Sequence, residues 1–374
     1  MAPERLIGVD IGTQGTKAAL FDGQGRCLAE AFEKSELRRP APGAVEEDPE
    51  RQTASVVHTI RRCVEEAGVN PAAVAAIAID GQMAGIIGIG EDGRAVTPYD
   101  SWLDTRCAPY IERMEREAGS RIIRRSGGPP SFNHGPKILW WMHERPEIFR
   151  CIRSFVQPGG YAAMRLCGLE AAEAFIDPTY LHFSGFADNE AKRWDEALCR
   201  RFGLDPAKLP RIVESAQLIG GLEPEAAGRC LLASGTPVVA GCGDTAASFL
   251  SCGATREGIC VDVAGTASVF ATTTSAMRPD LQHGMLACGR SAVPGLWHPY
   301  AYINGGGLNL EWFRRDIAGT ESFEELDRLA GALTAREDDP LFVPHLGGRV
   351  CPSQPALRGA WLGLAWDHGL GHLY

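Results

Sequence analysis

Short apolar runs separated by glycine-containing turns dominate the start of the chain. The pattern predicts strands over residues 6–10, 17–21 and 27–32, with turns at 12–15 and 22–25 between them. Turns this short connect neighbouring antiparallel strands. The N-terminal segment is therefore predicted to form an antiparallel meander of three strands.

A helical period begins after Asp48. Asp48 followed by Pro49 is a typical helix start, because the carboxylate can cap the first N–H groups and proline suits the first helical position. Apolar side chains then recur on one helical face between residues 56 and 67. The apolar run at 74–80 predicts a fully buried strand in the middle of a covered sheet.

Further along, helical and extended patterns alternate. Residues 105–167 are mainly helical, 172–187 are typical of an irregular loop, and 195–202 predict a short helix. Gly235 introduces a new buried strand at 238–241, so we expect one domain over 1–235 and a second over 236–374. Two strands at 260–263 and 268–272 are expected to form a hairpin around Gly265 and Thr266, and the glycines at 305–307 open a helix that reaches residue 316.

One pattern occurs twice. The segments VDIGT at 9–13 and VDVAGT at 261–266 each combine an apolar strand, an acidic residue and a Gly-Thr turn that leads into another strand. They stand at the start of two halves of similar size. The repeat predicts two related α/β domains that face each other.

Length, charge and cysteine usage narrow the function. The 374 residues suffice for two domains with sizeable cores. The net charge of -10 argues against a nucleic-acid partner, which needs a basic surface. The twelve cysteines show no CxxC pair, which is typical of reduced core cysteines. Neither a signal pattern nor a membrane-length apolar run occurs, so we expect a cytoplasmic enzyme or binding protein with no membrane partner.

The first motif with chemical potential is DIGTQGTK at 10–17. A glycine turn lets backbone N–H groups approach an anion, and Asp10 at the strand end could hold Mg²⁺ directly or through water. The simpler interpretation is an ordinary hairpin with a buried aspartate. The segment is neither a dinucleotide fingerprint nor a Walker A loop, because GxGxxG and GK[ST] are both absent.

Three further motifs combine polar side chains with strand or helix ends. In GCGDTAA at 241–247, Asp244 opens a helix of small residues and could accept a proton from a substrate hydroxyl, or could simply cap that helix. Gln82, in the segment DGQMAG, suits a polyhydroxy ligand, but the segment could also be only a tight turn. Trp102 and Asp104 are common sugar-binding types, although on spacing alone a helix cap at Asp104 with Trp102 in the core is the better explanation.

Taken together, these segments resemble the FGGY carbohydrate kinase family, and its xylulokinase-like members in particular. The resemblance spans nearly the whole chain through nine motifs in the family's order. They are GVDIGTQGTK, IAIDGQMAG, SWLDTR, GPKILW, TPVVAGCGDTAA, VDVAGTASV, GGGLNLEWFRRD, FVPHLGGRVCP and LRGAWLGL.

The resemblance implies an actin/hexokinase-like, ribonuclease H-like fold of two α/β domains with a cleft between them. It implies ATP, Mg²⁺ and an open sugar, with Asp244 as general base and Asp10 as the Mg²⁺-linked carboxylate. The residues implied in nucleotide binding are Gly12, Thr13, Lys17, Gly265, Thr266, Gly307 and Glu311. Those implied in sugar binding are Gln82, Met83, Trp102, Asp104, Phe132 and Thr245. Family members are often homodimers, so self-association is a further expectation.

Three departures from the family pattern leave two functions open. Ala84 stands where the xylulokinase-like pattern has histidine, and Thr245 where it has asparagine. Family members also continue beyond the position of Tyr374 with a turn that holds the adenosine, so we expect an incomplete second domain. The first hypothesis is a kinase for a D-xylulose-like pentulose or polyol. The second is a catalytically inactive sugar-binding remnant.

Overall fold

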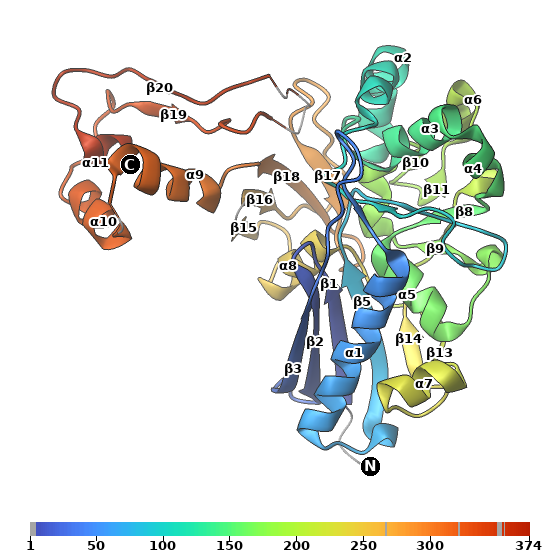
Figure 1. The fold of residues 1–374 in the computed structure, drawn as a ribbon. Coiled ribbons are helices and arrows are strands. Elements are labelled where there is room, and N and C mark those ends of the chain that lie inside the picture. Colours follow the sequence, from blue (N-terminus) through green and yellow to red (C-terminus); the bar gives the residue numbers. More distant parts are fainter. Residues whose placement is uncertain (1–4, 266–267, 321, 350–353, 355) are drawn as a thin grey trace.

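The computed structural model describes residues 5–265, 268–320, 322–349, 354 and 356–374. Its largest sheet has six strands at the base of the molecule (Figure 1). In spatial order they are β13 (Leu218–Gly221), β14 (Pro237–Val239), β5 (Val74–Gly81), β1 (Arg5–Ile11), β2 (Gly15–Asp22) and β3 (Cys27–Lys34). The predicted meander β1–β2–β3 is confirmed as antiparallel, whereas β5 runs parallel to both β1 and β14.

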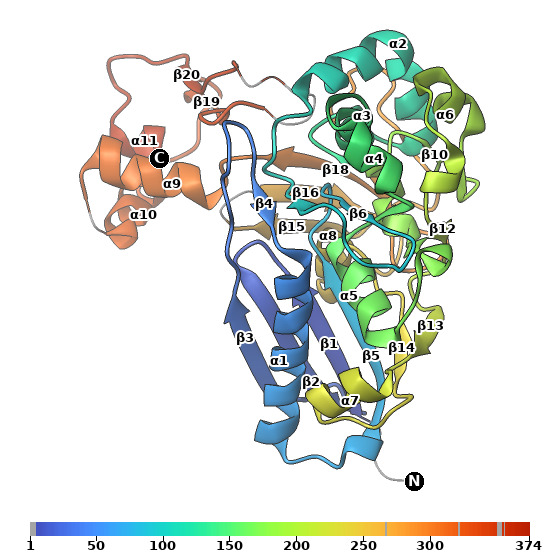
Figure 2. The ribbon, with the colours of Figure 1, turned by 45° about the vertical axis from the view of Figure 1, so that its right-hand side comes forward.

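One face of this sheet is covered by helices. Figure 2 shows α1 (Pro49–Ala67), α5 (Pro158–Cys167) and α7 (Pro224–Cys230) on that side. The predicted start of α1 is confirmed, since the Asp48 side chain accepts hydrogen bonds from the backbone N–H groups of Glu50 and Arg51. The buried side chains of α1 join alternate residues of β1 and β5 in the main core.

The other face of the sheet is more open than the sequence predicted. In β5 the residues Ile77 and Ile79 are buried, but Ala76, Ala78 and Asp80, which alternate with them, are partly exposed. The expectation that this strand is covered on both faces is therefore wrong. The run is apolar because it contains alanines, and these small side chains do not require burial on both faces. Asp10 and Asp80 point to this open face.

A second region is mainly helical, as predicted for residues 105–167. Its helices are α2 (Ala108–Ser126), α3 (His134–Glu144), α4 (Pro146–Cys151) and α6 (Glu196–Phe202). Short strand pairs brace it: β4 (Glu46–Glu47) with β7 (Tyr99–Asp100), β6 (Ile87–Ile89) with β8 (Ser154–Val156), β9 (Phe175–Ile176) with β12 (Arg211–Ile212), and β10 (Ala187–Asp188) with β11 (Arg193–Trp194). The short 3₁₀ turns η2 (Ala171–Glu173), η3 (Pro178–Phe183) and η4 (Pro206–Lys208) follow in this part of the chain, whereas η1 (Pro71–Ala73) connects α1 to β5.

A second, fully antiparallel sheet follows α8 (Asp244–Ser251). Its spatial order is β15 (Cys260–Ala264), β16 (Ser268–Thr272), β18 (Trp297–Ile303) and β17 (Ala287–Arg290). The predicted β15–β16 hairpin is confirmed, so both copies of the repeated pattern lie in antiparallel hairpins. The β17 strand lies against η3 and joins this sheet to the helical region.

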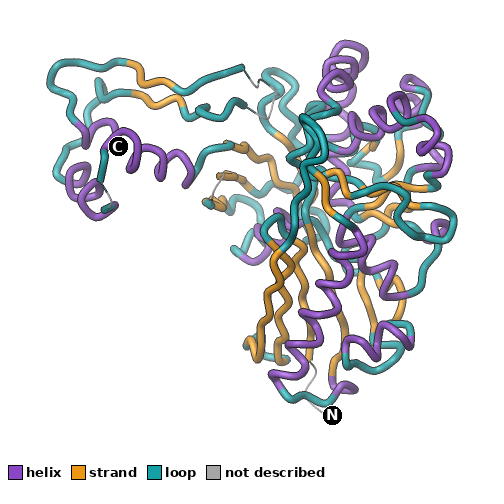
Figure 3. Tube along the Cα trace, viewed as in Figure 1, coloured by secondary structure: helices purple, strands orange, loops and turns teal. Residues whose placement is uncertain are grey.

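The last part of the chain lies apart from both sheets. It contains α9 (Gly307–Trp312), the π-helix η5 (Phe313–Ala318), α10 (Phe323–Gly331), the hairpin β19 (Leu341–Val343) and β20 (Ala360–Leu362), and α11 (Leu370–Leu373). Figure 3 shows this group of helices and its hairpin extending away from the main body. None of the helices in the described ranges is long and apolar enough to cross a membrane.

One strand that follows the domain boundary predicted at residue 235 belongs to the first sheet. β14 follows that position, yet it hydrogen-bonds to β5 in the first sheet, with Val238 beside Ile77. This pairing joins segments far apart in the sequence and leaves no local signal. The division into 1–235 and 236–374 stays a prediction.

Candidate active site

Three carboxylates meet at the carboxyl ends of the parallel strands. Asp10 and Asp80 are direct neighbours across the β1–β5 pair. Beyond β14, Gly243 bridges to Gly81 in parallel, which places Asp244 at the start of α8 beside them. Ligands of open α/β sheets bind at this edge, where the strands end and the chain turns into helices.

Crowding of these three acids shifts their proton affinities. Burial raises the pKa of Asp244 to about 7, and the nearby charge of Asp10 adds to the effect, against hydrogen bonds from Thr245 that lower it. Burial also raises the pKa of Asp10, and it raises that of Asp80 further together with the charge of Asp10. Like charges this close disfavour full ionisation.

The cluster offers oxygen atoms to a cation. The Oδ1 atoms of Asp10 and Asp80 are buried and have no hydrogen-bond partner among the described residues. Among the residues that the structure describes, no group of three His, Cys, Asp or Glu side chains is placed to hold one metal ion together. Mg²⁺ typically takes only one or two carboxylates and completes its shell with water and phosphate oxygens, so these residues fit that ion.

The turn between β1 and β2 is built for close backbone approach. Gly12 and Gly15 exchange backbone hydrogen bonds of 3.0 and 3.3 Å. A side chain on Gly15 would meet the Glu33 carbonyl oxygen at 2.3 Å, so glycine is required there. The N–H groups of Thr13 and Gln14 donate to no described residue, which leaves them available to an anion.

Other predicted residues of the first half have partners of their own. The Thr13 hydroxyl donates to Gln82 Oε1 at 3.2 Å and accepts from Trp102 Nε1 at 2.8 Å. Lys17 lies opposite Asp10 in the β1–β2 pair, and its ammonium forms a 3.2 Å ion pair with Glu30.

Asp104 lies in a buried ion-pair network. Its carboxylate accepts hydrogen bonds from the Val45 N–H at 2.9 Å and from Arg106 Nε at 2.8 Å. Arg106 also binds Asp100, whose pKa burial raises to about 7. Asp104 does not cap a helix, because α2 begins at Ala108; instead it fixes the loop that carries Trp102.

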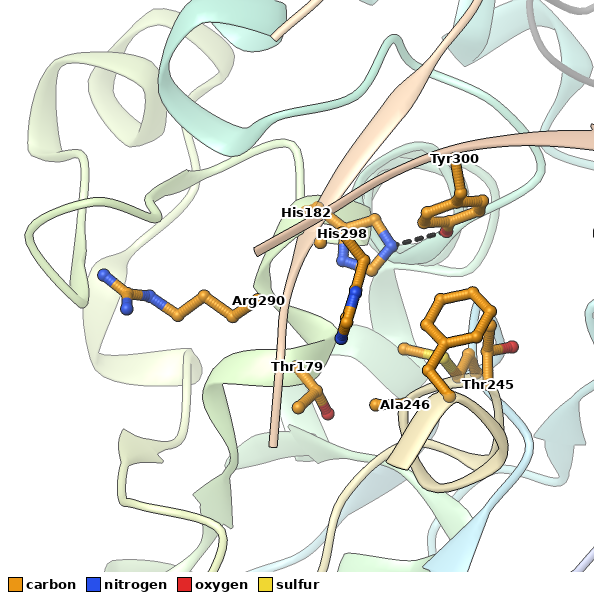
Figure 4. Close-up of a pocket in the computed structure, with 10 residues that line it drawn as sticks. Thr179, His182, Thr245, Ala246, Arg290, His298 and Tyr300 are labelled. Carbon is orange, nitrogen blue, oxygen red and sulfur yellow. Dashed lines mark hydrogen bonds between the residues drawn. The ribbon is translucent and has the colours of Figure 1, made fainter. Parts of the chain in front are cut away.

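Met83 and Thr245 come together in the lining of one pocket. Figure 4 shows the pocket, whose walls come from the turn after β5, from η3, from α8 and from β17 and β18. Phe132 is not part of its lining and packs instead against the core of the helical region. The structure therefore brings two of the predicted sugar-binding residues together beside Asp244.

The pocket also contains residues that the sequence did not single out. His182 Nε2 and the Tyr300 hydroxyl form a 2.7 Å hydrogen bond inside it. Burial lowers the pKa of His182 to about 3 and also lowers that of His298, so both imidazoles are neutral near pH 7. Each histidine stands alone in an ordinary apolar stretch of the sequence, so the sequence did not predict that these residues come together in the pocket.

The second hairpin and α9 also approach one another. The N–H of Gly307 donates to the Gly265 carbonyl oxygen at 2.7 Å, which holds the start of α9 against the turn after β15. Thr266 lies outside the described residues. Glu311, one turn along α9, forms an ion pair with Arg314 at 2.5 Å.

Known proteins match both the sequence and the fold. The FGGY family of carbohydrate kinases, N-terminal domain, matches residues 5–251. The chain is 28% identical to the xylulose kinase of Escherichia coli over 98% of this chain and 74% of the relative, and 26% identical to the gluconokinase of Bacillus subtilis over 98% and 73%. The crystal structure of xylulose kinase from Rhodospirillum rubrum superposes with a TM-score of 0.89 at 25% identity, over 99% of this chain and 75% of that one.

The class of protein follows from the fold and the named relatives: it has the actin/hexokinase-like fold and is an ATP-dependent sugar kinase. The chain belongs to the FGGY family of carbohydrate kinases. The sequence resemblance is thereby confirmed for the family and the fold. The roles of individual residues and the identity of the sugar are taken up below as proposals.

Proposed function

We propose that this kinase transfers the γ-phosphoryl group of ATP to a hydroxyl of a D-xylulose-like pentulose or related open-chain polyol, with Asp244 as general base. The observation that carries the proposal is the carboxylate cluster at the ends of β1, β5 and β14. There, burial and the nearby charge of Asp10 raise the pKa of Asp244 to about 7, which suits proton transfer near neutral pH.

Phosphoryl transfer requires positioning and charge neutralisation more than covalent chemistry from the protein. The free N–H groups of Thr13 and Gln14 can receive phosphate oxygens at the first turn. The second turn, with Gly265, Thr266 and Gly307, is proposed to close on the phosphates from the other side. Lys17 and Glu311 remain predicted nucleotide residues.

Asp10 and Asp80 are the residues we propose to hold Mg²⁺, which neutralises phosphate charge when it is bound. Asp80 supplements the single ligand expected from the sequence. Asp244 stays available to the acceptor because Thr245 donates two hydrogen bonds to its Oδ1 atom alone, at 2.5 and 3.1 Å. The other carboxylate oxygen can accept the hydroxyl proton as the new phosphate ester bond forms.

The sugar is proposed to bind at the pocket formed by Met83 and Thr245, with Gln82, Trp102, Asp104 and Phe132 as further predicted contacts. An uncharged acceptor fits this pocket better than an aldonate such as gluconate. Among the described residues, Arg290 is the one arginine or lysine in its lining, and its guanidinium points away from the pocket (Figure 4). It donates to the carbonyl oxygens of Asn189 and Glu190 and lies 4.1 Å from the Trp297 ring centre.

The experiment is ADP release from MgATP, measured with D-xylulose, other ketoses, polyols and gluconate as acceptors, and with Asp244→Asn as the control. Release that depends on an uncharged acceptor and is lost in the control is the expected result. Faster turnover with gluconate than with every uncharged acceptor would refute the proposed substrate class. No release from a folded sample that binds sugar would instead support the inactive alternative.

Two coarser expectations accompany this function. We infer a cytoplasmic location from the need for ATP. A homodimer stays a prediction, which light scattering of the purified chain would test.

A further inference from the structure

A chain of hydrogen bonds runs from the edge of the site into the interior. Trp102 Nε1 donates to Thr13 Oγ1 at 2.8 Å, and Thr13 Oγ1 donates to Gln82 Oε1 at 3.2 Å. Gln82 Nε2 in turn donates to Glu47 Oε1 at 2.9 Å. Each donor points the same way along this chain, which ends at a carboxylate that is 2% exposed.

The direction of the whole chain depends on its last member. An ionised carboxylate can only accept hydrogen bonds, so Gln82 must present its NH₂ group to Glu47. Its carbonyl oxygen is then turned to Thr13, and the single hydroxyl hydrogen of Thr13 is committed to it. The Thr13 oxygen is left to accept from the Trp102 indole. Gln82 is 1% exposed, so water is a poor substitute for either partner.

Glu47 forms part of a pocket wall together with Gly12 and Gln52, close to the phosphate turn. Across the strand pair its neighbour is Tyr99, and no Lys, Arg or His among the described residues forms an ion pair with it. Burial raises the pKa of Glu47, while the amides of Gln82 and Gln52 hold it down. A buried carboxylate without a cation is unfavourable for stability, which makes a role in the site the better explanation.

We propose that Glu47 is a positioning residue, which fixes the orientation of the Gln82 amide and thereby the Thr13 hydroxyl at the phosphate turn and the Trp102 indole beside it. The inference rests on the proposed function for its effect on catalysis. In this proposal Glu47 acts through Gln82, without contact to phosphate or sugar. With the Thr13 hydroxyl turned inward, the turn meets phosphate through its backbone N–H groups.

A double-mutant cycle tests this coupling. Glu47→Gln keeps the shape of the side chain but can donate as well as accept, so it no longer dictates the Gln82 orientation. We expect it to lower kcat/KM by about tenfold, equivalent to about 1.4 kcal/mol. In a Thr13→Val background, where no hydroxyl remains to be oriented, the same change should cost less than about twofold, because coupled residues are not additive.

Controls separate this effect from loss of folding. Glu65→Gln removes a carboxylate that pairs with Arg61 on the exposed side of α1, away from Gln82, so it should leave kcat/KM unchanged. Equal losses from Glu47→Gln in both backgrounds, with all variants folded by circular dichroism and thermal unfolding, would mean a general structural role and overturn the proposal. The same holds if Glu47→Gln retains full activity.

A second measurement does not need catalysis. In a ¹H–¹⁵N spectrum of the full chain, the Trp102 indole signal can be assigned by its loss in Trp102→Phe. Reorientation of the Thr13 hydroxyl in Glu47→Gln should move this signal and leave other indole signals in place. An unmoved signal would refute the positioning role. A wild-type chain that phosphorylates nothing but shows the expected movement would overturn the proposed function alone.

Discussion

Replacing Asp244 with asparagine should stabilise the fold while it removes catalysis. Burial, together with the nearby charge of Asp10, raises the pKa of this carboxylate from its ordinary 3.8 to about 7. The folded protein therefore holds the proton more tightly than the unfolded chain does. Asparagine has nearly the same shape and no charge, so it removes the cost of burying a charge beside Asp10 but cannot accept the substrate proton.

The magnitude follows from the two pKa values. The difference between 3.8 and about 7 corresponds to roughly a thousandfold in proton affinity, or about 4 kcal/mol. Below about pH 4 both states are protonated and the ionisation has no effect on stability. As the pH rises from about 4 to 7 the unfolded chain ionises first, so wild-type stability falls; above about 7 the loss is constant. The asparagine amide also has to find partners, so the net gain at pH 8 should be about 1–3 kcal/mol.

Urea unfolding of both proteins at about pH 5.5 and pH 8 measures this gain. The advantage of Asp244→Asn should be larger at pH 8 than at pH 5.5, and its turnover should fall by about 10²–10⁴-fold, as expected for loss of a general base. Asp92→Asn, at an exposed loop position, is the matched control and should change neither quantity. A variant that is less stable than wild type at pH 8, or an advantage that shrinks as the pH rises, would refute the electrostatic reasoning.

Three further predictions concern the same region. Because the base acts only when deprotonated, kcat/KM should rise between about pH 6 and 8 with a midpoint near the Asp244 pKa of about 7; a flat profile over that range would contradict it. Gly241→Ala should destabilise the fold by more than about 1 kcal/mol in urea unfolding, since Gly241 has φ +73° and a side chain would lie 2.0 Å from the Ile79 carbonyl oxygen. Arg106→Met should cost about 3–5 kcal/mol by leaving the buried Asp104 carboxylate unpaired, and unchanged stability at neutral pH would show that the network is dispensable.

Much of the local architecture could be predicted from the sequence because its causes are local. The Asp48 cap and Pro49 set the start of α1, and the glycine turns set the two hairpins. The motif order gave the family, which the match over residues 5–251 confirms. The open face of β5 was missed, since an apolar run does not reveal whether small side chains are covered.

By itself, the sequence determined the elements, the repeated hairpin and the catalytic candidates Asp10 and Asp244, because these depend on neighbours along the chain. Only the tertiary structure decided that Asp80 joins them, that β14 belongs to the first sheet, and that Glu47 ends the hydrogen-bond chain through Gln82. Those contacts join segments distant in sequence, through parallel strand pairing and burial. Their energies depend on crowding and desolvation, which exist only once the chain is folded.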